Sequence, residues 1–417
     1  MKKFNISTFF LIVIIASIVT SCDLNISNPN TPTEADVLST AQGLKAVAIG
    51  MQGRMAIGVD DQVLIPGLLA GEFSANSNSM ANDREFQDQM IIEDNASVRL
   101  LWSHSYQAIK SANDILHNID AVQFSDGTKN GMVALAKTAK VIEFTTLLQC
   151  GFQQLPVETY NSNTPSFVSK TEAINYCLTL LSEAATPAAN VSDEFTNDIL
   201  GDGFDLLNTI KVFQARLSLM KEDYSAAITF ANSVDAGATS VFVYSAINLN
   251  PMTDNFHTRH MFGATANWRD NAESGDTRVE ALFDTTSYNS GLTWTNPDEN
   301  KLYDVLLWKN QLSSFELFRY GEMTLIKAEA YARTNDLSNA ATQINIIRSA
   351  AGLANFNSND QSAVLQEILK QRQYELYATG VSLEDLRRFG KISLAKVAWL
   401  PYPQVERESN PSTPSNP

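Results

Sequence analysis

Two tryptophans in polar sequence are the residues of this chain whose types best suit ligand chemistry. Trp268 and Trp294 lie in a segment, 235–314, where Gly, Asn, Thr, Ser and Asp dominate and apolar residues have no regular spacing. A flat indole can cover the C–H face of a sugar while polar neighbours such as Arg269 bond its hydroxyls. The same rings could instead plug an irregular subdomain. Both interpretations stay open, and Trp268 is the stronger ligand candidate.

A second polar stretch covers residues 71–95 and reads GEFSANSNSMANDREFQDQM over its first twenty positions. It is too long for a simple connection between two helices. Long loops in compact domains are usually functional or disordered. The stretch is therefore the second place where we look for a ligand site.

Metal and catalytic chemistry have weaker support. His257 and His260 have i, i+3 spacing, but no third ligand is identifiable, so no metal or cofactor is predicted. The sequence contains no GxSxG, HExxH, P-loop or dinucleotide-binding motif. Asp270, Glu273 or Asp276 could serve a glycosidase, which needs only two suitably spaced carboxylates. Because no barrel or sandwich is predicted to hold them, no catalytic residue is assigned, and a glycoside hydrolase is kept as an alternative.

Composition excludes some partners. The 417 residues carry a formal charge of −16, with 44% hydrophobic and 18% charged residues, which fits a globular protein with a large core. Nucleic acid rewards a basic surface, so a nucleic-acid partner is not expected. The charge is compatible with neutral ligands or simply with solubility.

The N-terminus predicts export and lipid anchoring. Lys2 and Lys3 precede an apolar run over 9–19, which is too short to span a bilayer and has the form of a signal peptide. Small residues then lead to Cys22, in the pattern of a lipobox. Lipidation of Cys22 would hold the protein on a membrane, and the Asn-, Ser- and Pro-rich residues 23–33 would be a tether. The alternative is a secreted protein with an unmodified cysteine.

Two further cysteines lie in apolar helical patterns. Cys150 and Cys177 could form a disulfide in an oxidising compartment. Each could equally be a buried free thiol that packs as a small hydrophobic residue. The sequence leaves this open.

Periodic apolar residues predict that helices position these segments. In one of them, Trp102, Tyr106 and Ile109 recur at helical spacing, which favours a core position for Trp102 over a sugar platform. Helices are expected over 34–55, 64–70, 98–119, 132–149, 170–185, 206–220 and 224–234. Short β-like runs are expected at 241–244 and 305–308, the latter giving Trp308 a core position.

The stretch 315–391 reads as a helical hairpin followed by a third helix. On the first helix, Glu322 and Glu329 fall on the side opposite the apolar stripe. Gly352 stands where a helix C-cap needs positive φ. Stacked helix pairs of this kind are the building units of tetratricopeptide-type repeats.

This same stretch resembles the C-terminal signature of the SusD/RagB family. The similarity is carried in order by the motifs Arg319…Glu322…Leu325-Ile326-Lys327-Ala328-Glu329-Ala330, Arg348…Gly352-Leu353, Gln371-Arg372 and Asp385-Leu386-Arg387-Arg388-Phe389-Gly390. Gln371 and Thr379 depart from the family, which usually has glutamate at both places. These departures put one buried ion pair in doubt rather than the fold.

The resemblance implies a function. Members of this family are surface lipoproteins of Gram-negative bacteria that bind nutrients, usually glycans, and form the lid of a SusC-like TonB-dependent transporter. It also implies that the 71–95 loop helps to line the ligand site and that Asp276 and Arg278 form a structural Asp-x-Arg pair. The predicted ligand residues are then Asn76, Asn78, Asp83, Arg84, Phe86, Trp268, Arg269 and Trp294, with Cys22 as the lipidation site.

The sequence thus predicts a mainly α protein: stacked tetratricopeptide-like helical hairpins with an irregular, loop-rich ligand-binding subdomain. The expected parts are a signal peptide (1–21), anchor and tether (22–40), N-terminal helical scaffold (41–234), ligand-binding subdomain (235–314), C-terminal helical scaffold (315–395) and tail (396–417). The expected location is the outer membrane, facing outward. A helical protein–protein adaptor is the main alternative, although it has little use for a tryptophan-bearing insertion.

Overall fold

The structure is a computed structural model that describes residues 33–287 and 302–417. Its helices are α2 (Glu34–Leu38), α3 (Ala41–Ile57), α4 (Val59–Ala70), α5 (Ala81–Asp88), α6 (Ala96–Asn118), α7 (Asp126–Cys150), α8 (Lys170–Ala188), α9 (Asp193–Asp198), α10 (Leu206–Met220), α11 (Tyr224–Ser233), α12 (Pro251–Thr253), α13 (Ala266–Asp270), α14 (Arg278–Leu282), α15 (Tyr320–Arg333), α16 (Leu337–Ala350), α17 (Gln361–Glu375), α18 (Ser382–Arg388) and α19 (Gln404–Ser409). Short 3-10 turns, η1 (Ile119–Ala121) and η4 (Ile392–Leu394), and a π-helical turn, η2 (Asp254–Thr258), accompany them.

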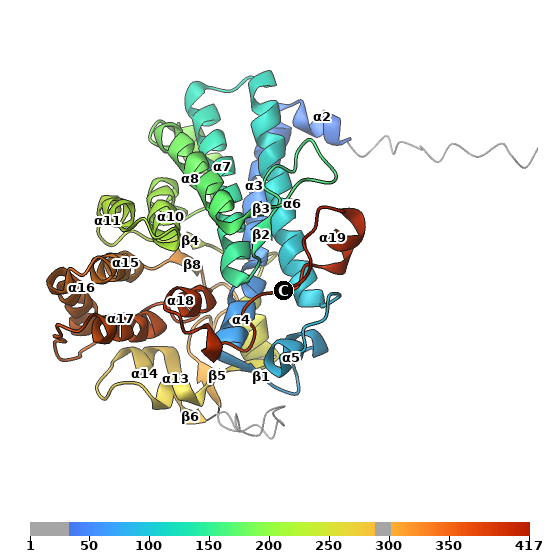
Figure 1. The fold of residues 1–417 in the computed structure, drawn as a ribbon. Coiled ribbons are helices and arrows are strands. Elements are labelled where there is room, and N and C mark those ends of the chain that lie inside the picture. Colours follow the sequence, from blue (N-terminus) through green and yellow to red (C-terminus); the bar gives the residue numbers. More distant parts are fainter. Residues whose placement is uncertain (1–32, 288–301) are drawn as a thin grey trace, which may run out of the picture.

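Helix pairs stack side by side through most of the molecule. The pairs α3–α6, α7–α8, α10–α11 and α15–α16 each pack closely, and α6–α7, α8–α10 and α11–α15 join one pair to the next. Figure 1 shows this row running from α3 and α6 to α16. Helix α17 packs against α15 and α16, and α18 packs against α4 and α7. The prediction of a mainly α protein built from stacked hairpins is confirmed.

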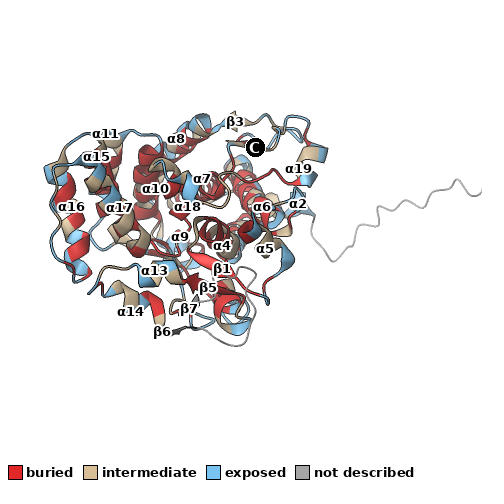
Figure 2. Ribbon diagram, turned by 60° about the horizontal axis from the view of Figure 1, so that its bottom comes forward, coloured by how far each residue is buried: buried red, intermediate tan, exposed pale blue. Residues whose placement is uncertain are grey.

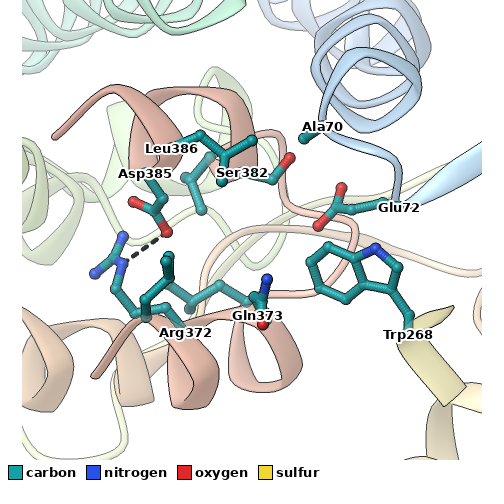
Figure 3. Close-up of a pocket in the computed structure, with 11 residues that line it drawn as sticks. Ala70, Glu72, Trp268, Arg372, Gln373, Ser382, Asp385 and Leu386 are labelled. Atoms are coloured by element: carbon teal, nitrogen blue, oxygen red, sulfur yellow. Dashed lines mark hydrogen bonds and ion pairs between the residues drawn. The ribbon is translucent and has the colours of Figure 1, made fainter. Parts of the chain in front are cut away.

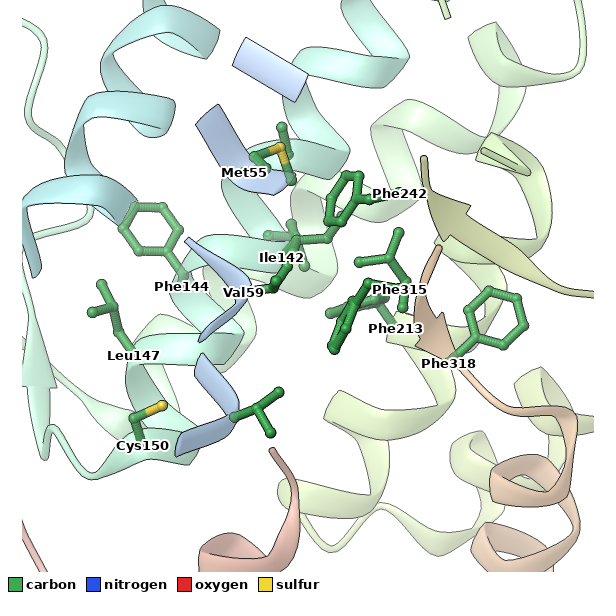
Figure 4. Packing of buried hydrophobic residues seen from close by; sticks show 14 of the residues in the cluster. Met55, Val59, Ile142, Phe144, Leu147, Cys150, Phe213, Phe242, Phe315 and Phe318 are labelled. Carbon is green, nitrogen blue, oxygen red and sulfur yellow. The ribbon is translucent and has the colours of Figure 1, made fainter. Parts of the chain in front are cut away.

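Small residues let these helices approach. On α15 and α16, Ala328, Ala332 and Ala340 are fully buried together with Ile344. Nearer the middle of the row, aromatic side chains fill the junction between α10 and a small sheet, where Phe213, Phe242, Phe315 and Phe318 converge (Figure 4). Figure 2 shows the buried faces of the helices turned toward the interior of the row.

The strands are short, and the largest sheet lies at one end of the molecule, whereas the two smaller ones lie among the helices (Figure 1). β1 (Phe73–Ala75), β5 (Phe262–Thr265), β7 (Leu302–Val305) and β6 (Phe283–Ser287) form a four-stranded antiparallel sheet in that order. β2 (Gln154–Leu155) pairs with β3 (Val168–Ser169), and β4 (Ser240–Phe242) pairs with β8 (Phe315–Phe318). The stretch 235–314 was predicted to be irregular, and its described part holds short strands and single helical turns.

Some predicted boundaries are wrong. The expected helix over 34–55 is two helices, because the backbone becomes extended at Thr40, whose side chain caps the second one. Residues 34–38, assigned to the tether, are therefore helical. The expected β-like run at 305–308 ends at Val305, and Trp308 has φ +53° but is buried as expected, stacked on Phe315.

Residues Phe315–Phe318 were expected to begin a helix and instead form β8. Phe315 is buried, Glu316 is exposed, and the last two side chains are buried. The strand pairs with β4, and the pairing contains a bulge. The helix proper starts at Tyr320. Gly352 follows α16 with φ +76°, which confirms the expected C-cap.

The polar side of α15 is buried as well. Glu322 and Glu329, expected opposite the apolar stripe, are 2% and 1% exposed. Arg216 of α10 donates two hydrogen bonds of 2.7 Å to the Glu322 carboxylate, and Arg388 of α18 donates to both oxygens of Glu329 at 3.1 and 2.7 Å. Helices on both sides of α15 therefore leave it no solvent-facing stripe.

The C-terminal tail belongs to the fold. Tyr402 is buried and its hydroxyl accepts from the backbone N–H of Gln154, while α19 packs near α6. Both cysteines, Cys150 and Cys177, are buried free thiols. Over 33–287 and 302–417, no helix has the length and apolar character needed to cross a bilayer.

Candidate functional site

Pairing of β1 with β5 joins the two polar segments selected from the sequence. Phe73 faces Ala264 and Ala75 faces Phe262, so residues 71–88 and 254–270 form one continuous region at the end of the helical row (Figure 1). The paired strand residues are separated by more than 180 positions in the chain. The expectation that both segments serve one site therefore has the spatial basis it requires.

Asparagine side chains fasten this region together. The Asn76 side-chain amide donates to the backbone carbonyl of His260 at 2.5 Å, and its carbonyl accepts from the backbone N–H of Asn78. Asn76 is buried, so its role in the structure is to hold the loop. Asn78 is exposed and donates weakly to the carbonyl of Arg259 at 3.3 Å, which leaves it accessible to a ligand.

Two predicted ligand residues face the interior instead. α5 forms inside the stretch that was predicted to be a loop, and it buries Asp83 and Phe86. Phe86 has no exposed surface, and the Asp83 carboxylate accepts from the Ser97 hydroxyl at 2.7 Å. Burial raises the pKa of Asp83. Neither side chain can reach a ligand in this conformation, and this part of the prediction is corrected. Arg84 is half-buried and donates to the carbonyl of Ser79.

Trp268 and Arg269 lie on α13, directly after β5. The Trp268 ring is half-buried, with its centroid 5.5 Å from that of Tyr377, and its backbone carbonyl accepts from the Tyr374 hydroxyl at 2.7 Å. The Arg269 guanidinium lies 4.4 Å from the centre of the Tyr303 ring, close enough for a cation–π interaction between the two side chains. Trp294, the other predicted aromatic, lies outside the described residues.

A small polar cavity adjoins Trp268. It has a volume of about 20 Å³, enough for one water molecule, and Figure 3 shows Glu72 and Trp268 facing Arg372 and Asp385 across it. Arg372 donates to Asp385 at 2.7 Å, whereas its Nη1 and the Glu72 Oε2 have no hydrogen-bond partner among the described residues. Burial raises the pKa of Glu72 to about 8. This carboxyl is therefore mostly protonated near neutral pH and can donate a hydrogen bond into the cavity.

Sequence reasoning missed Glu72 and its neighbours. The partners that enclose it, Arg372 and Ser382, come from α17 and α18, about 300 positions later. A single glutamate after Gly71 carries no spacing signal for such a cavity. Only the family-like motif around Arg372 marked that part of the chain, and it pointed to an ion pair.

The histidines and carboxylates considered for metal binding or hydrolysis are held by other parts of the fold. The His257 ring bonds the carbonyl of Leu307 at 2.7 Å, and no group of three or more potential ligands is found in the described ranges. Arg348 and Lys370 hold the Glu273 carboxylate and lower its pKa to about 2. Asp276 pairs with Arg278 at 2.7 Å, as predicted, and Asp270 lies 3.6 Å from the Arg269 guanidinium, so all three carboxylates considered for hydrolysis take part in ion pairs.

Spacing along β1 sets the scale of the region. Asn78 lies beyond one end of the paired strands, and Trp268 and Glu72 lie at the other. At roughly 3.3 Å per residue, the four steps from Glu72 to Asn76 span about 13 Å. A ligand that contacts both ends must therefore be elongated, with an apolar face for Trp268 and hydrogen-bonding groups for Asn78.

Known proteins share sequence features and the fold of this chain. The model of the SusD family matches residues 258–416. No curated protein sequence matches the chain. A SusD superfamily protein from Bacteroides vulgatus has the same fold, with a TM-score of 0.70, 17% identity and coverage of 92% of this chain and 98% of the other.

Two structures from Bacteroides thetaiotaomicron are similar to the same degree. One is a SusD superfamily protein with a TM-score of 0.72, 17% identity and coverage of 90% of this chain and 99% of the other. The second is surface glycan-binding protein A in complex with laminarihexaose, with a TM-score of 0.71, 15% identity and coverage of 90% and 99%. The resemblance inferred from the motifs is confirmed, by sequence over 258–416 and by fold over most of the described chain.

Proposed function

From the premise that this is a SusD-like chain, in its C-terminal sequence and in its fold, we propose that it binds a glycan at the outer face of the outer membrane. The single observation that supports this is the joining of residues 71–88 and 254–270 on one small sheet, with the half-buried ring of Trp268 at one end and the exposed amide of Asn78 at the other. Aromatic rings combined with amides are the usual means of binding a neutral sugar.

The protein then delivers the bound glycan to a SusC-like TonB-dependent transporter, and it catalyses no reaction. Lipidation at Cys22, which lies outside the described residues, anchors it in the outer membrane. Trp294, also outside them, stays a proposed ligand residue with Trp268 and Arg269. Mass spectrometry of the mature N-terminus tests the anchor, and co-purification of a TonB-dependent receptor from outer membranes tests the partner.

Calorimetry with a panel of oligosaccharides that includes laminarihexaose tests the ligand. For a saccharide that binds, Trp268→Ala should weaken the affinity at least tenfold, because a stacked aromatic contact and its buried area are removed. Asn78→Ala should weaken it by a smaller factor, because the amide is exposed and its loss removes hydrogen bonds only.

The matched control is Trp399→Ala. Trp399 is also half-buried, but it stacks on Arg387 and lies outside the region joined by β1 and β5. Its replacement should leave the affinity unchanged. Equal losses in both tryptophan variants, or no loss in either, would remove Trp268 from the site. Capture of a protein partner with no saccharide binding would favour the adaptor alternative.

A further inference from the structure

A second, larger cavity lies at a different place in the fold. It has a volume of about 530 Å³ and is enclosed by α6, the segment 156–165 and α19. It shares no lining residue with the cavity beside Trp268. Its size falls within the range of small-molecule sites. Figure 1 places α19 beside α6, above α5 in that view and away from α13 and α14.

Fixed aromatic rings form part of its wall. The Trp102 and Tyr106 centroids are 4.7 Å apart, and Trp102 also packs on Phe152 and Tyr402. The Trp102 indole N–H donates to the Glu406 carboxylate at 3.3 Å, and the Tyr106 hydroxyl donates to the Pro156 carbonyl at 3.1 Å. These rings were predicted to be core, and Trp102 is indeed buried. Both rings also line the cavity. A ligand could therefore contact their edges without any change in the position of either ring.

Apolar surface is also exposed at the mouth. Val405 is 59% exposed and stands on α19, where it lines the cavity next to Pro403. Exposed single apolar residues are common, but here one adjoins two aromatic rings and two prolines, Pro165 and Pro403. The combination gives the cavity a continuous apolar side.

Polar groups of the same two helices are held in position before a ligand binds. The Gln107 side chain accepts from Arg54 and donates to the Ser103 hydroxyl at 2.9 Å, so its amide plane is fixed. The Glu406 carboxylate accepts from Asn410 at 3.1 Å besides its bond from Trp102. Preorganised hydrogen-bonding groups lose little entropy when a ligand arrives.

Two further side chains have hydrogen-bond donors with no partner among the described residues. The side chains of Arg99 and Asn163 line the cavity, and neither has a hydrogen bond or ion pair with any residue in the part of the chain that is described. Lys110, in contrast, is paired with Glu34 and Asp114. One unpaired cation and the Glu406 carboxylate leave the lining close to neutral, which fits an uncharged ligand.

We propose that this cavity is a second saccharide-binding site, suited to a neutral oligosaccharide of a few rings. The apolar side covers the C–H faces of the sugar, and Gln107, Asn163, Arg99 and Glu406 bond its hydroxyls. A phosphorylated or strongly acidic ligand would place its charge against Glu406 in a protein of formal charge −16. The site takes the same ligand class as the proposed function, and its residues are independent of Trp268.

The test closes the cavity without disturbing the core. Val405→Trp places a large ring in the mouth from an exposed position, whereas replacing Trp102 could unfold the protein. The matched control is Gln404→Trp, at the neighbouring exposed position, which does not line the cavity and points about 100° away around the helix. Thermal melts of both variants should agree with the unchanged protein to within a few degrees.

Saturation-transfer NMR and calorimetry are carried out with a panel of neutral oligosaccharides that includes laminarihexaose. At least one saccharide should lose tenfold or more in affinity, or one of two binding events, in Val405→Trp but not in Gln404→Trp. Arg99→Ala should weaken the same event severalfold. Trp268→Ala should leave it unchanged, which separates this site from the proposed one.

Other outcomes overturn the proposal. Binding that depends on Trp268 alone leaves the proposed function standing and removes the second site. Binding that depends on Val405 alone supports the second site and removes the first. A panel in which no saccharide responds to Val405→Trp refutes a saccharide site in this cavity.

Discussion

Replacing Gln371 by glutamate tests how α17 holds the segment that carries Trp268. Gln371 is fully buried between a cation and an anion: its carbonyl accepts from Arg278 at 2.7 Å, and its amide donates to the Glu367 carboxylate at 2.8 Å. The related family usually has a glutamate at this position. Here the amide allows one side chain to bond both neighbours, so the departure that put an ion pair in doubt has a structural reason.

The expected cost follows from the lost donor. With Gln371→Glu, a second carboxylate faces Glu367 at hydrogen-bond distance, where the amide donated. Losing a hydrogen bond to a charged group costs about 1.5–3 kcal/mol. A stronger bond to Arg278 offsets only part of this, because Asp276 already holds that guanidinium with bonds of 2.9 and 2.7 Å. We expect a net loss of about 2 kcal/mol in the free energy of unfolding at pH 7.5.

The loss should also depend on pH. Burial and Glu367 raise the pKa of the introduced carboxyl in the folded state above its unfolded value of about 4.3. A raised carboxyl pKa means that stability falls as pH rises through the window between the two values. The destabilisation should therefore shrink between pH 7.5 and pH 5, where the protonated carboxyl again donates to Glu367.

Denaturant unfolding at both pH values measures this, with Gln366→Glu as the control. Gln366 lies on the same helix but is exposed, so the same change of charge should shift stability by less than about 0.5 kcal/mol. If Gln371→Glu is as stable as the unchanged protein at pH 7.5, then Arg278 dominates the environment of this side chain and the reasoning is refuted.

Three further changes probe buried groups. Burial raises the pKa of Glu72 to about 8, so the free energy of unfolding of the unchanged protein should fall from pH 5 to pH 8. Glu72→Gln should reduce that fall by a few kcal/mol. Denaturant titrations in which the variant shows the same dependence of stability on pH would contradict this. Arg216→Met should cost about 3–5 kcal/mol, since it leaves the Glu322 carboxylate buried without its two bonds, and adding Glu322→Leu should recover much of it; a Tm near that of the unchanged protein for the single variant would count against this. Burial raises the pKa of Cys150 and that of Cys177, the latter to about 12, so a thiol reagent should reach neither of these two thiols in the native protein and both after unfolding, with Cys22 counted apart. Fewer than two without reductant would mean a disulfide.

The helical scaffold could be predicted because the residues that mark each helix lie within that helix or next to its ends. Apolar residues at helical spacing and capping residues such as Thr33 and Gly352 mark each hairpin within a few residues of its true ends. The failures occur where a distant partner decides. Glu322 and Glu329 looked solvent-facing because their arginine partners lie 106 and 59 positions away. Phe315–Phe318 became a strand because β4 supplies the other half of its ladder.

The candidate site was predictable in its segments and less so in its side chains. Composition located the stretches 71–95 and 235–314, since both are polar and interrupt the helical pattern. Composition could not distinguish Asn76, whose side chain holds the loop, from Asn78, which is exposed. The difference depends on how close each amide lies to the backbone carbonyl of His260 or Arg259, far away in the sequence. Phe86 is buried because α5 forms there, and neighbouring polar residues hid that helix.

The sheet that carries the candidate site cannot hold its own position. Strands of three to five residues with little core between them are marginal in water without packing against helices. Hydroxyls on and just after α17 supply that support: Tyr377 donates to the Glu72 carbonyl at 3.2 Å, and Tyr374 donates to that of Trp268. Both bonds go to the backbone, so they fix where these positions lie without requiring particular side chains there. The residues that would contact a ligand can therefore change while the helices keep their place.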